Sequence, residues 1–165
     1  MVDDEARRRA WFDAYVQRCE QGVIRPPAPG LRYRCPCCSY LTLPERGGYD
    51  ICCLCNWEDD GQDDPRANDT WGGPNGAYSL AEARRNFARH LIMYDPVRPN
   101  TRIGGPDSPL ELEAKRAMIA AFNAMPSAPD DITLAALWQR VVDAEAILTA
   151  ETNRKVKEHE SSHEA

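Results

Sequence analysis

Two closely spaced pairs of cysteines constrain the fold of this chain more than any other feature. Six of its seven cysteines lie between Tyr33 and Trp57, and they contain two Cys-x-x-Cys pairs, Cys35/Cys38 and Cys52/Cys55, with 13 residues between the pairs. Each pair is expected to fold into a tight turn that directs two sulfurs at one point, which is how four thiolates surround a tetrahedral ion. The spacing therefore predicts a structural metal site with no position open for water.

The segment between the pairs is suited to a β-hairpin. Residues 40–43 and 49–51 are short β-prone runs, and Pro44–Gly48 between them is rich in turn residues. Turn, hairpin and turn together form the plan of a zinc ribbon. Zinc is the predicted ion, with iron as the alternative, because a four-thiolate site binds either metal.

Four motifs in this region resemble the bacterial cysteine-rich CPCC family from about Tyr33 to Phe87. They are Cys35-Pro-Cys-Cys, Gly-Gly-Tyr-Asp-Ile-Cys-x-x-Cys55, Trp57-Glu-Asp-Asp-Gly-Gln-Asp-Asp64 and Gly72-Gly-Pro-Asn-Gly76. The chain departs from the family pattern at Cys53, where proline is usual, and at Ser39, where glycine is usual. The resemblance implies metal binding by Cys35, Cys38, Cys52 and Cys55, and it implies no particular reaction.

The other three cysteines are less suited to bind the metal. Cys37 and Cys53 occupy matching interior positions of the two pairs. They are predicted not to be ligands; the alternatives are a shifted ligand register, a two-metal cluster or redox thiols. Cys19 falls on the apolar face of a predicted helix, where a buried structural thiol is expected.

The predicted fold class is α+β, with a small zinc-ribbon-like β-hairpin module, an N-terminal helix and a C-terminal helical hairpin. Serines followed three residues later by glutamate predict helix starts at Ser79 and Ser108. The C-terminal helical hairpin is expected to cover the ribbon, the first helix or a second subunit. The predicted regions are an N-terminal helix at 1–22, the metal module with its following helix at 31–96, the helical hairpin at 107–152 and a polar tail at 153–165.

Charge is distributed unevenly along the chain. The net charge is −6, and four thiolates with a divalent ion would bring it to about −8, which disfavours nucleic-acid binding. Arginines dominate residues 25–48, where Arg32 and Arg34 are predicted neighbours of the thiolates, while acids dominate residues 57–69. Three interpretations of the acidic segment remain open: a solvated loop, a recognition surface for a basic protein, and a second metal site. The predicted partner-binding residues are Trp57, Glu58, Asp59, Asp60, Asp63 and Asp64.

No catalytic constellation is evident, so the sequence predicts a non-enzymatic, protein-binding zinc module, such as a bacterial immunity or adaptor protein with a basic partner. The alternatives are a metal-dependent hydrolase that uses residues 58–64 and a nucleic-acid-binding ribbon that uses Arg25, Arg32, Arg34 and Arg46. His159 and His163 are four residues apart, but in a charged tail they are expected to be solvated. Neither a secretion signal nor a membrane-spanning stretch is apparent, so a cytoplasmic location is expected.

Overall fold

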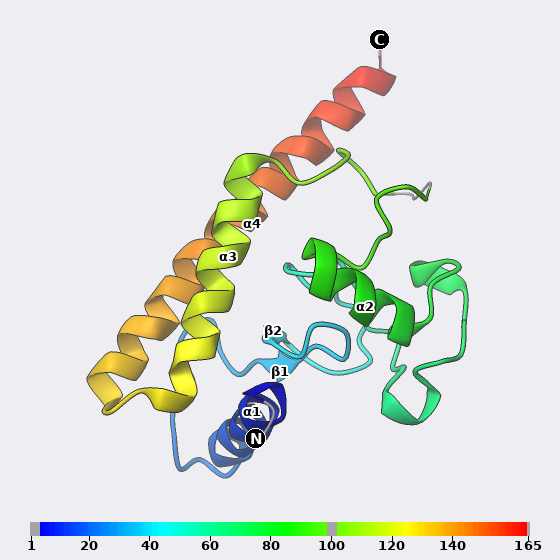
Figure 1. The fold of residues 1–165 in the computed structure, drawn as a ribbon. Helices are drawn as coiled ribbons and strands as arrows, with labels where there is room; N and C mark the ends of the chain where they lie inside the picture. Colours follow the sequence, from blue (N-terminus) through cyan, green and yellow to red (C-terminus); the bar gives the residue numbers. More distant parts are fainter. Residues whose placement is uncertain (1–3, 99–101, 165) are drawn as a thin grey trace. The chain divides into compact units, whose positions relative to one another are not determined.

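The computed structural model describes residues 4–98 and 102–164, which divide into two compact units, residues 1–96 and 97–165. Figure 1 shows the chain coloured from its N-terminus to its C-terminus. The helices and strands are α1 (Asp4–Glu20), β1 (Tyr33–Arg34), β2 (Leu41–Leu43), α2 (Leu80–His90), α3 (Pro109–Ala124) and α4 (Asp131–His163).

Helix α1 forms where the sequence predicts the first helix. Its acidic first turn suits the positive end of the helix dipole. Phe12, Tyr15 and Cys19 are its buried residues, and the Phe12 ring meets Tyr40 edge-on with centroids 6.3 Å apart. The predicted burial of Cys19 is thus confirmed.

The predicted α+β class is confirmed, but the strands pair differently from the expected hairpin. Strand β1 pairs antiparallel with β2, so these two strands flank the first cysteine pair. Residues 49–51 do not pair with 40–43; instead Ile51 forms an isolated bridge with Glu58 across the second cysteine pair. The reason is that each Cys-x-x-Cys turn itself reverses the chain, which brings each strand against the segment just beyond its own turn.

Helix α2 follows a long, ordered loop. The Ser79 side chain caps the helix by accepting from the Glu82 N–H, and the helix ends at Leu91, which takes a left-handed conformation with φ 57°. Just beyond it, the Met93 N–H donates to the Cys55 carbonyl at 2.8 Å. The chain therefore returns from α2 to the second cysteine turn.

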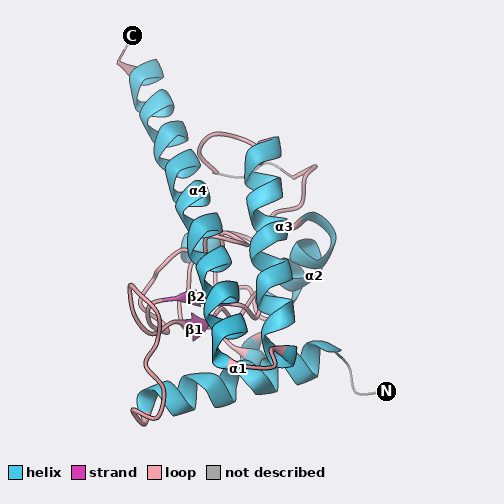
Figure 2. Ribbon diagram, turned by 90° about the vertical axis from the view of Figure 1, so that its left-hand side faces the viewer, coloured by secondary structure: helices cyan, strands magenta, loops and turns pink. Residues whose placement is uncertain are grey.

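In the C-terminal unit, α3 and α4 lie side by side as the predicted helical hairpin (Figures 1 and 2). The capping box at Ser108 and Glu111 is present on α3. Phe122 and Trp138 meet edge-on across the pair, with ring centroids 5.8 Å apart.

Residues 153–163 of the predicted polar tail are helical, since α4 continues to His163 (Figure 2). Lys155 explains this extension. Its Nζ lies 2.6 Å from a carboxylate oxygen of Glu111 and 3.1 Å from the Pro106 carbonyl, so the part of α4 around Lys155 is anchored to α3 and to the loop before α3. In the described part of the chain, no helix has the length and apolar character required to cross a membrane.

Candidate metal centre

The four predicted ligand cysteines converge in the N-terminal unit. The Sγ atoms of Cys35, Cys38, Cys52 and Cys55 all lie within 4.8 Å of one another, and all four residues are buried. Cys35 and Cys55 have sulfurs 3.6 Å apart, as do Cys38 and Cys52, and all four are free cysteines. Sulfurs around a tetrahedral zinc ion with ordinary Zn–S bonds are about 3.8 Å apart. The quartet is therefore spaced for one metal ion.

The first cysteine turn is closed by its own backbone. The Cys35 N–H donates to the Tyr40 carbonyl at 2.8 Å, and the Ser39 N–H donates back to the Cys35 carbonyl at 2.9 Å. Ser39 adopts φ 67°, the left-handed region that favours glycine. The position where the family usually has glycine is thus one where the backbone needs a positive φ.

The second turn repeats this arrangement. The Cys52 N–H donates to the Trp57 carbonyl at 2.9 Å, the Asn56 N–H donates to the Cys52 carbonyl at 2.9 Å, and Asn56 has φ 69°. Asparagine tolerates this conformation better than most residues. Two equivalent turns therefore present two sulfurs each to a common centre.

Hydrogen-bond donors reach the sulfurs of the second turn. The Thr42 hydroxyl oxygen lies 3.0 Å from Cys52 Sγ, and the Trp57 N–H lies 3.5 Å from Cys55 Sγ. Such donors stabilise negative charge on sulfur and orient metal ligands.

Burial shapes the protonation of the quartet. It raises the pKa of Cys35, Cys38 and Cys55 well above the usual thiol value. Burial also disfavours the Cys52 thiolate, but hydrogen bonds from the other three thiols outweigh it and lower the pKa of Cys52. Four buried thiolates thus require a cation, and a divalent ion with a preference for sulfur fits this donor set. Cys35, Cys38, Cys52 and Cys55 would hold zinc, which would supply a structural cross-link between the two turns.

Comparison with known proteins agrees with this geometry. Residues 33–107 match the family model described as Cysteine-rich CPCC. This segment is therefore similar to the cysteine-rich CPCC family, and residues 33–107 are called the CPCC module below. The match extends beyond Phe87, where the recognisable motifs end. No curated protein and no solved structure matches the chain.

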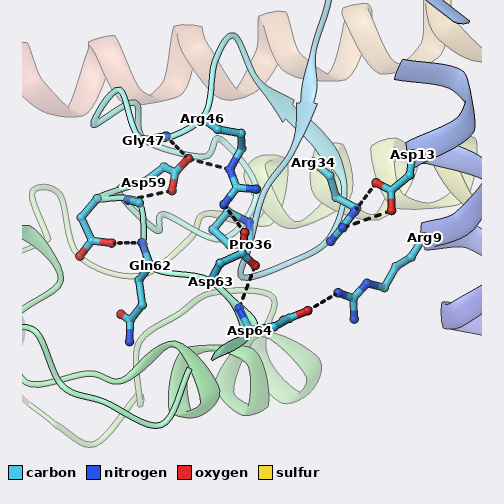
Figure 3. A network of polar contacts seen from close by, with 12 residues as sticks. Arg9, Asp13, Arg34, Pro36, Arg46, Gly47, Asp59, Gln62, Asp63 and Asp64 are labelled. Carbon is cyan, nitrogen blue, oxygen red and sulfur yellow. Dashed lines mark hydrogen bonds and ion pairs between the residues drawn. The ribbon is translucent and has the colours of Figure 1, made fainter. Parts of the chain in front are cut away.

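The acidic segment of the CPCC module, residues 58–64, forms hydrogen bonds and ion pairs with other parts of the module, as Figure 3 shows. The Asp59 side chain is completely buried, and its carboxylate accepts from the Gly47 N–H at 2.7 Å, the Gly61 N–H at 3.3 Å and Arg46 Nε at 2.9 Å. Arg46 also donates to Asp63 at 2.8 Å. The basic and acidic segments seen in the sequence thus neutralise each other in part.

Asp64 connects this segment to both helices of the unit. One carboxylate oxygen accepts from Arg9 of α1 at 3.2 Å, and the other accepts from Arg84 of α2 at 2.7 Å. Arg84 also donates to the Pro36 carbonyl at 2.9 Å, inside the first cysteine turn. Salt bridges to these two arginines lower the pKa of Asp64.

These contacts correct two predictions about the acidic segment. Trp57 and Asp59 are fully buried and are not available to a partner, because Trp57 packs in the interior and Asp59 binds backbone N–H groups. The solvated-loop interpretation is corrected in part: Asp59 and Asp60 fasten their own turns by accepting from the N–H groups two residues later, but the buried Gln62 side chain anchors the loop by donating to the Arg66 and Asp69 carbonyls at 2.6 and 2.7 Å. Glu58, Asp60, Asp63 and Asp64 keep some exposure.

The structure also reassigns the arginines around the metal centre. Arg34 pairs with Asp13 of α1 at 3.0 Å, so its guanidinium is committed to α1. Arg84 of α2, which the sequence did not single out, contacts the first turn instead, through the Pro36 carbonyl. Its late position in the chain gave no sign of this contact.

Asn75 is a structural residue that the sequence did not reveal. Its side-chain oxygen accepts from the Glu58 N–H at 3.0 Å, and its amide nitrogen donates to the Glu58 carbonyl at 2.8 Å. The amide therefore takes the place of a neighbouring strand. The Gly72–Gly76 motif could have suggested a special turn, but not its target.

Among the described residues, the cysteine quartet is the one group of three or more side chains able to hold a metal ion. The carboxylates of residues 58–64 form no such group. His159 and His163 lie together on α4 with ring centroids 4.3 Å apart, but they bring no third ligand.

Proposed function

We propose that the CPCC module is a non-enzymatic structural-zinc module that binds a protein partner. The observation that carries the metal assignment is the buried quartet of sulfurs at tetrahedral spacing. Four protein thiolates fill the coordination sphere, so no position is left for a reacting water molecule. The metal would hold two turns together rather than perform chemistry.

The partner is proposed to be a basic protein, as expected for an immunity or adaptor role. A net charge of −6 supports this choice, because such a chain attracts cationic surfaces and is repelled by phosphate backbones. A reducing cytoplasm is the compartment that suits a thiolate site.

The proposal is tested by affinity capture from native extract with the metal-loaded protein, with Cys52→Ser and with the matched control Cys53→Ser. A stoichiometric partner that the wild type and Cys53→Ser retain and Cys52→Ser loses supports the proposal. A partner captured equally by all three proteins, or no partner in any of them, contradicts it.

A further inference from the structure

The strand segment beside the second cysteine turn has an exposed apolar side. Ile51 and Glu58 form an antiparallel bridge, so their side chains lie on the same face of this two-stranded segment. Ile51 is 59% exposed, and Tyr49, two residues before it, is 58% exposed. The neighbouring Cys52 and Trp57 are fully buried. Two large apolar side chains are thus exposed to solvent next to the second cysteine turn.

One backbone edge of this segment is open and the other is closed. The bonds that flank the bridge run from the Cys52 N–H to the Trp57 carbonyl and from the Asp59 N–H to the Asp50 carbonyl. The N–H and C=O of Ile51 therefore point to the opposite side, where no residue of the described ranges 4–98 and 102–164 bonds to them. The other edge, at Glu58, is occupied by the Asn75 amide. An open edge of this kind can accept an added strand.

Two acids of residues 58–64 have no cationic partner in the described part of the chain. Asp59, Asp63 and Asp64 are each bonded to an arginine. By contrast, Glu58 and Asp60 have no cationic partner among the residues that the structure describes. Asp60 accepts only from the Gln62 N–H at 3.1 Å and, at 3.4 Å, from the Asn75 amide. Asp60 therefore lies toward the closed edge, whereas Glu58 shares the face of Ile51 and is the acid left to attract a cation there.

We propose that the edge at Ile51 binds an extended, lysine- or arginine-bearing segment of the protein partner as an added β-strand. Backbone hydrogen bonds to Ile51 would fix the strand, its apolar side chains would pack on Tyr49 and Ile51, and a cationic side chain on the same face would lie near Glu58. This inference rests on the proposed protein-binding function and names the site and the partner's chemistry.

The test uses the metal-loaded full chain and a fluorescein-labelled peptide of alternating lysine and valine, followed by fluorescence anisotropy. Saturable binding is expected, and Glu58→Lys should weaken it about tenfold because charge reversal replaces attraction by repulsion. Tyr49→Ala should also weaken it, while Trp71→Ala, a matched exposed aromatic elsewhere in the unit, should not. Metal content is measured for every variant, so that loss of folding is recognised.

A second peptide separates strand addition from simple charge attraction. It carries N-methyl groups on alternate amides and keeps every lysine, so it is expected not to bind. Equal binding of both peptides, absence of saturable binding, or unchanged binding by Glu58→Lys and Tyr49→Ala overturns the inference. Concentration-dependent dimers in sedimentation that Tyr49→Ala abolishes would instead assign the edge to a second copy and also overturn it. If extract partners are captured by Glu58→Lys as by the wild type, the proposed function stands and this inference falls.

Discussion

The two units of this chain bury polar groups in different ways. The N-terminal unit has two very short strands, and its interior holds a cysteine quartet and the buried side chains of Asp59, Gln62 and Asn75. The C-terminal unit is a helical pair with an aromatic and aliphatic interior, edged by buried ion pairs at Lys115 and Lys155. Helices satisfy their own backbones, whereas long loops need specific partners or a metal ion. The comparison predicts that the first unit depends on metal and the second on packing and charge.

Removal of the metal is the largest perturbation available. Stripping the protein with a chelator should expose the backbone N–H groups of residues 33–60 to solvent, because uncompensated thiolates cannot stay buried together. Helices α3 and α4 should keep their protection, since no cysteine lies on them. Hydrogen exchange with mass spectrometry checks both expectations. Equal loss of protection in the two units would show that the C-terminal unit depends on the metal as much as the N-terminal unit does.

Breaking a buried ion pair is the corresponding test of the C-terminal unit. Lys155→Met leaves the Glu111 carboxylate buried without its ammonium, which should cost about 3–5 kcal/mol of unfolding free energy. Urea unfolding followed by far-ultraviolet circular dichroism measures the change. Adding Glu111→Gln should restore much of the loss, and Lys157→Met, at an exposed site two residues later, should have little effect. A Lys155→Met protein as stable as Lys157→Met would mean that the pair does not hold α4.

Acid should act on the C-terminal unit through Asp107. Burial alone would raise the pKa of Asp107, but Lys115, 2.6 Å away, and Arg102 outweigh burial and hold it below its usual value. A carboxyl whose pKa is lowered in the folded state stabilises that state at pH values above its pKa in the unfolded chain, which is about 4. This stabilisation is lost as the pH falls through the pKa of the carboxyl in the folded state. Thermal unfolding at a series of pH values should show that the melting temperature falls as the pH decreases below that value. Asp107→Asn should flatten the decline, and an unchanged profile would exclude Asp107 as its source.

The smallest expected effect concerns a single hydroxyl at the metal centre. Thr42→Val keeps the shape of the side chain but removes the oxygen 3.0 Å from Cys52 Sγ. One hydrogen bond is worth about 1 kcal/mol, so metal transfer to a competing chelator should become a few-fold faster. Thr42→Ser, which retains the hydroxyl, is the matched control. Identical rates for Val and Ser would show that this oxygen does not stabilise the sulfur.

Cysteine spacing and capping motifs were sufficient to predict much of the fold. Metal ligands can be recognised from the sequence when the residue type, here cysteine in closely spaced pairs, has few other uses. The capping box of Ser108 and Glu111 marks the start of a helix through contacts between neighbouring residues alone. These features depend on neighbours only a few residues away, or on one rare residue type.

Features that depend on distant partners could not be predicted. Hydrophobicity gave no reason for α4 to pass Asn153, because its anchor is the pairing of Lys155 with Glu111, 44 residues earlier. Similarly, the run of acids at residues 58–64 looked like a solvated surface, although Asp59 is held by Arg46 and by backbone N–H groups. A charged residue is therefore predicted to be exposed unless the distant group that pairs with it is known.

The most direct test of this account is elemental analysis of the purified wild-type protein together with Cys52→Ser and Cys53→Ser. One zinc or iron ion per chain is expected in the wild type and in Cys53→Ser, because Cys53 lies outside the sulfur quartet. Cys52→Ser should lose the ion and lower the melting temperature. A wild type without stoichiometric metal, or a Cys52→Ser protein that keeps both ion and melting temperature, would contradict the account.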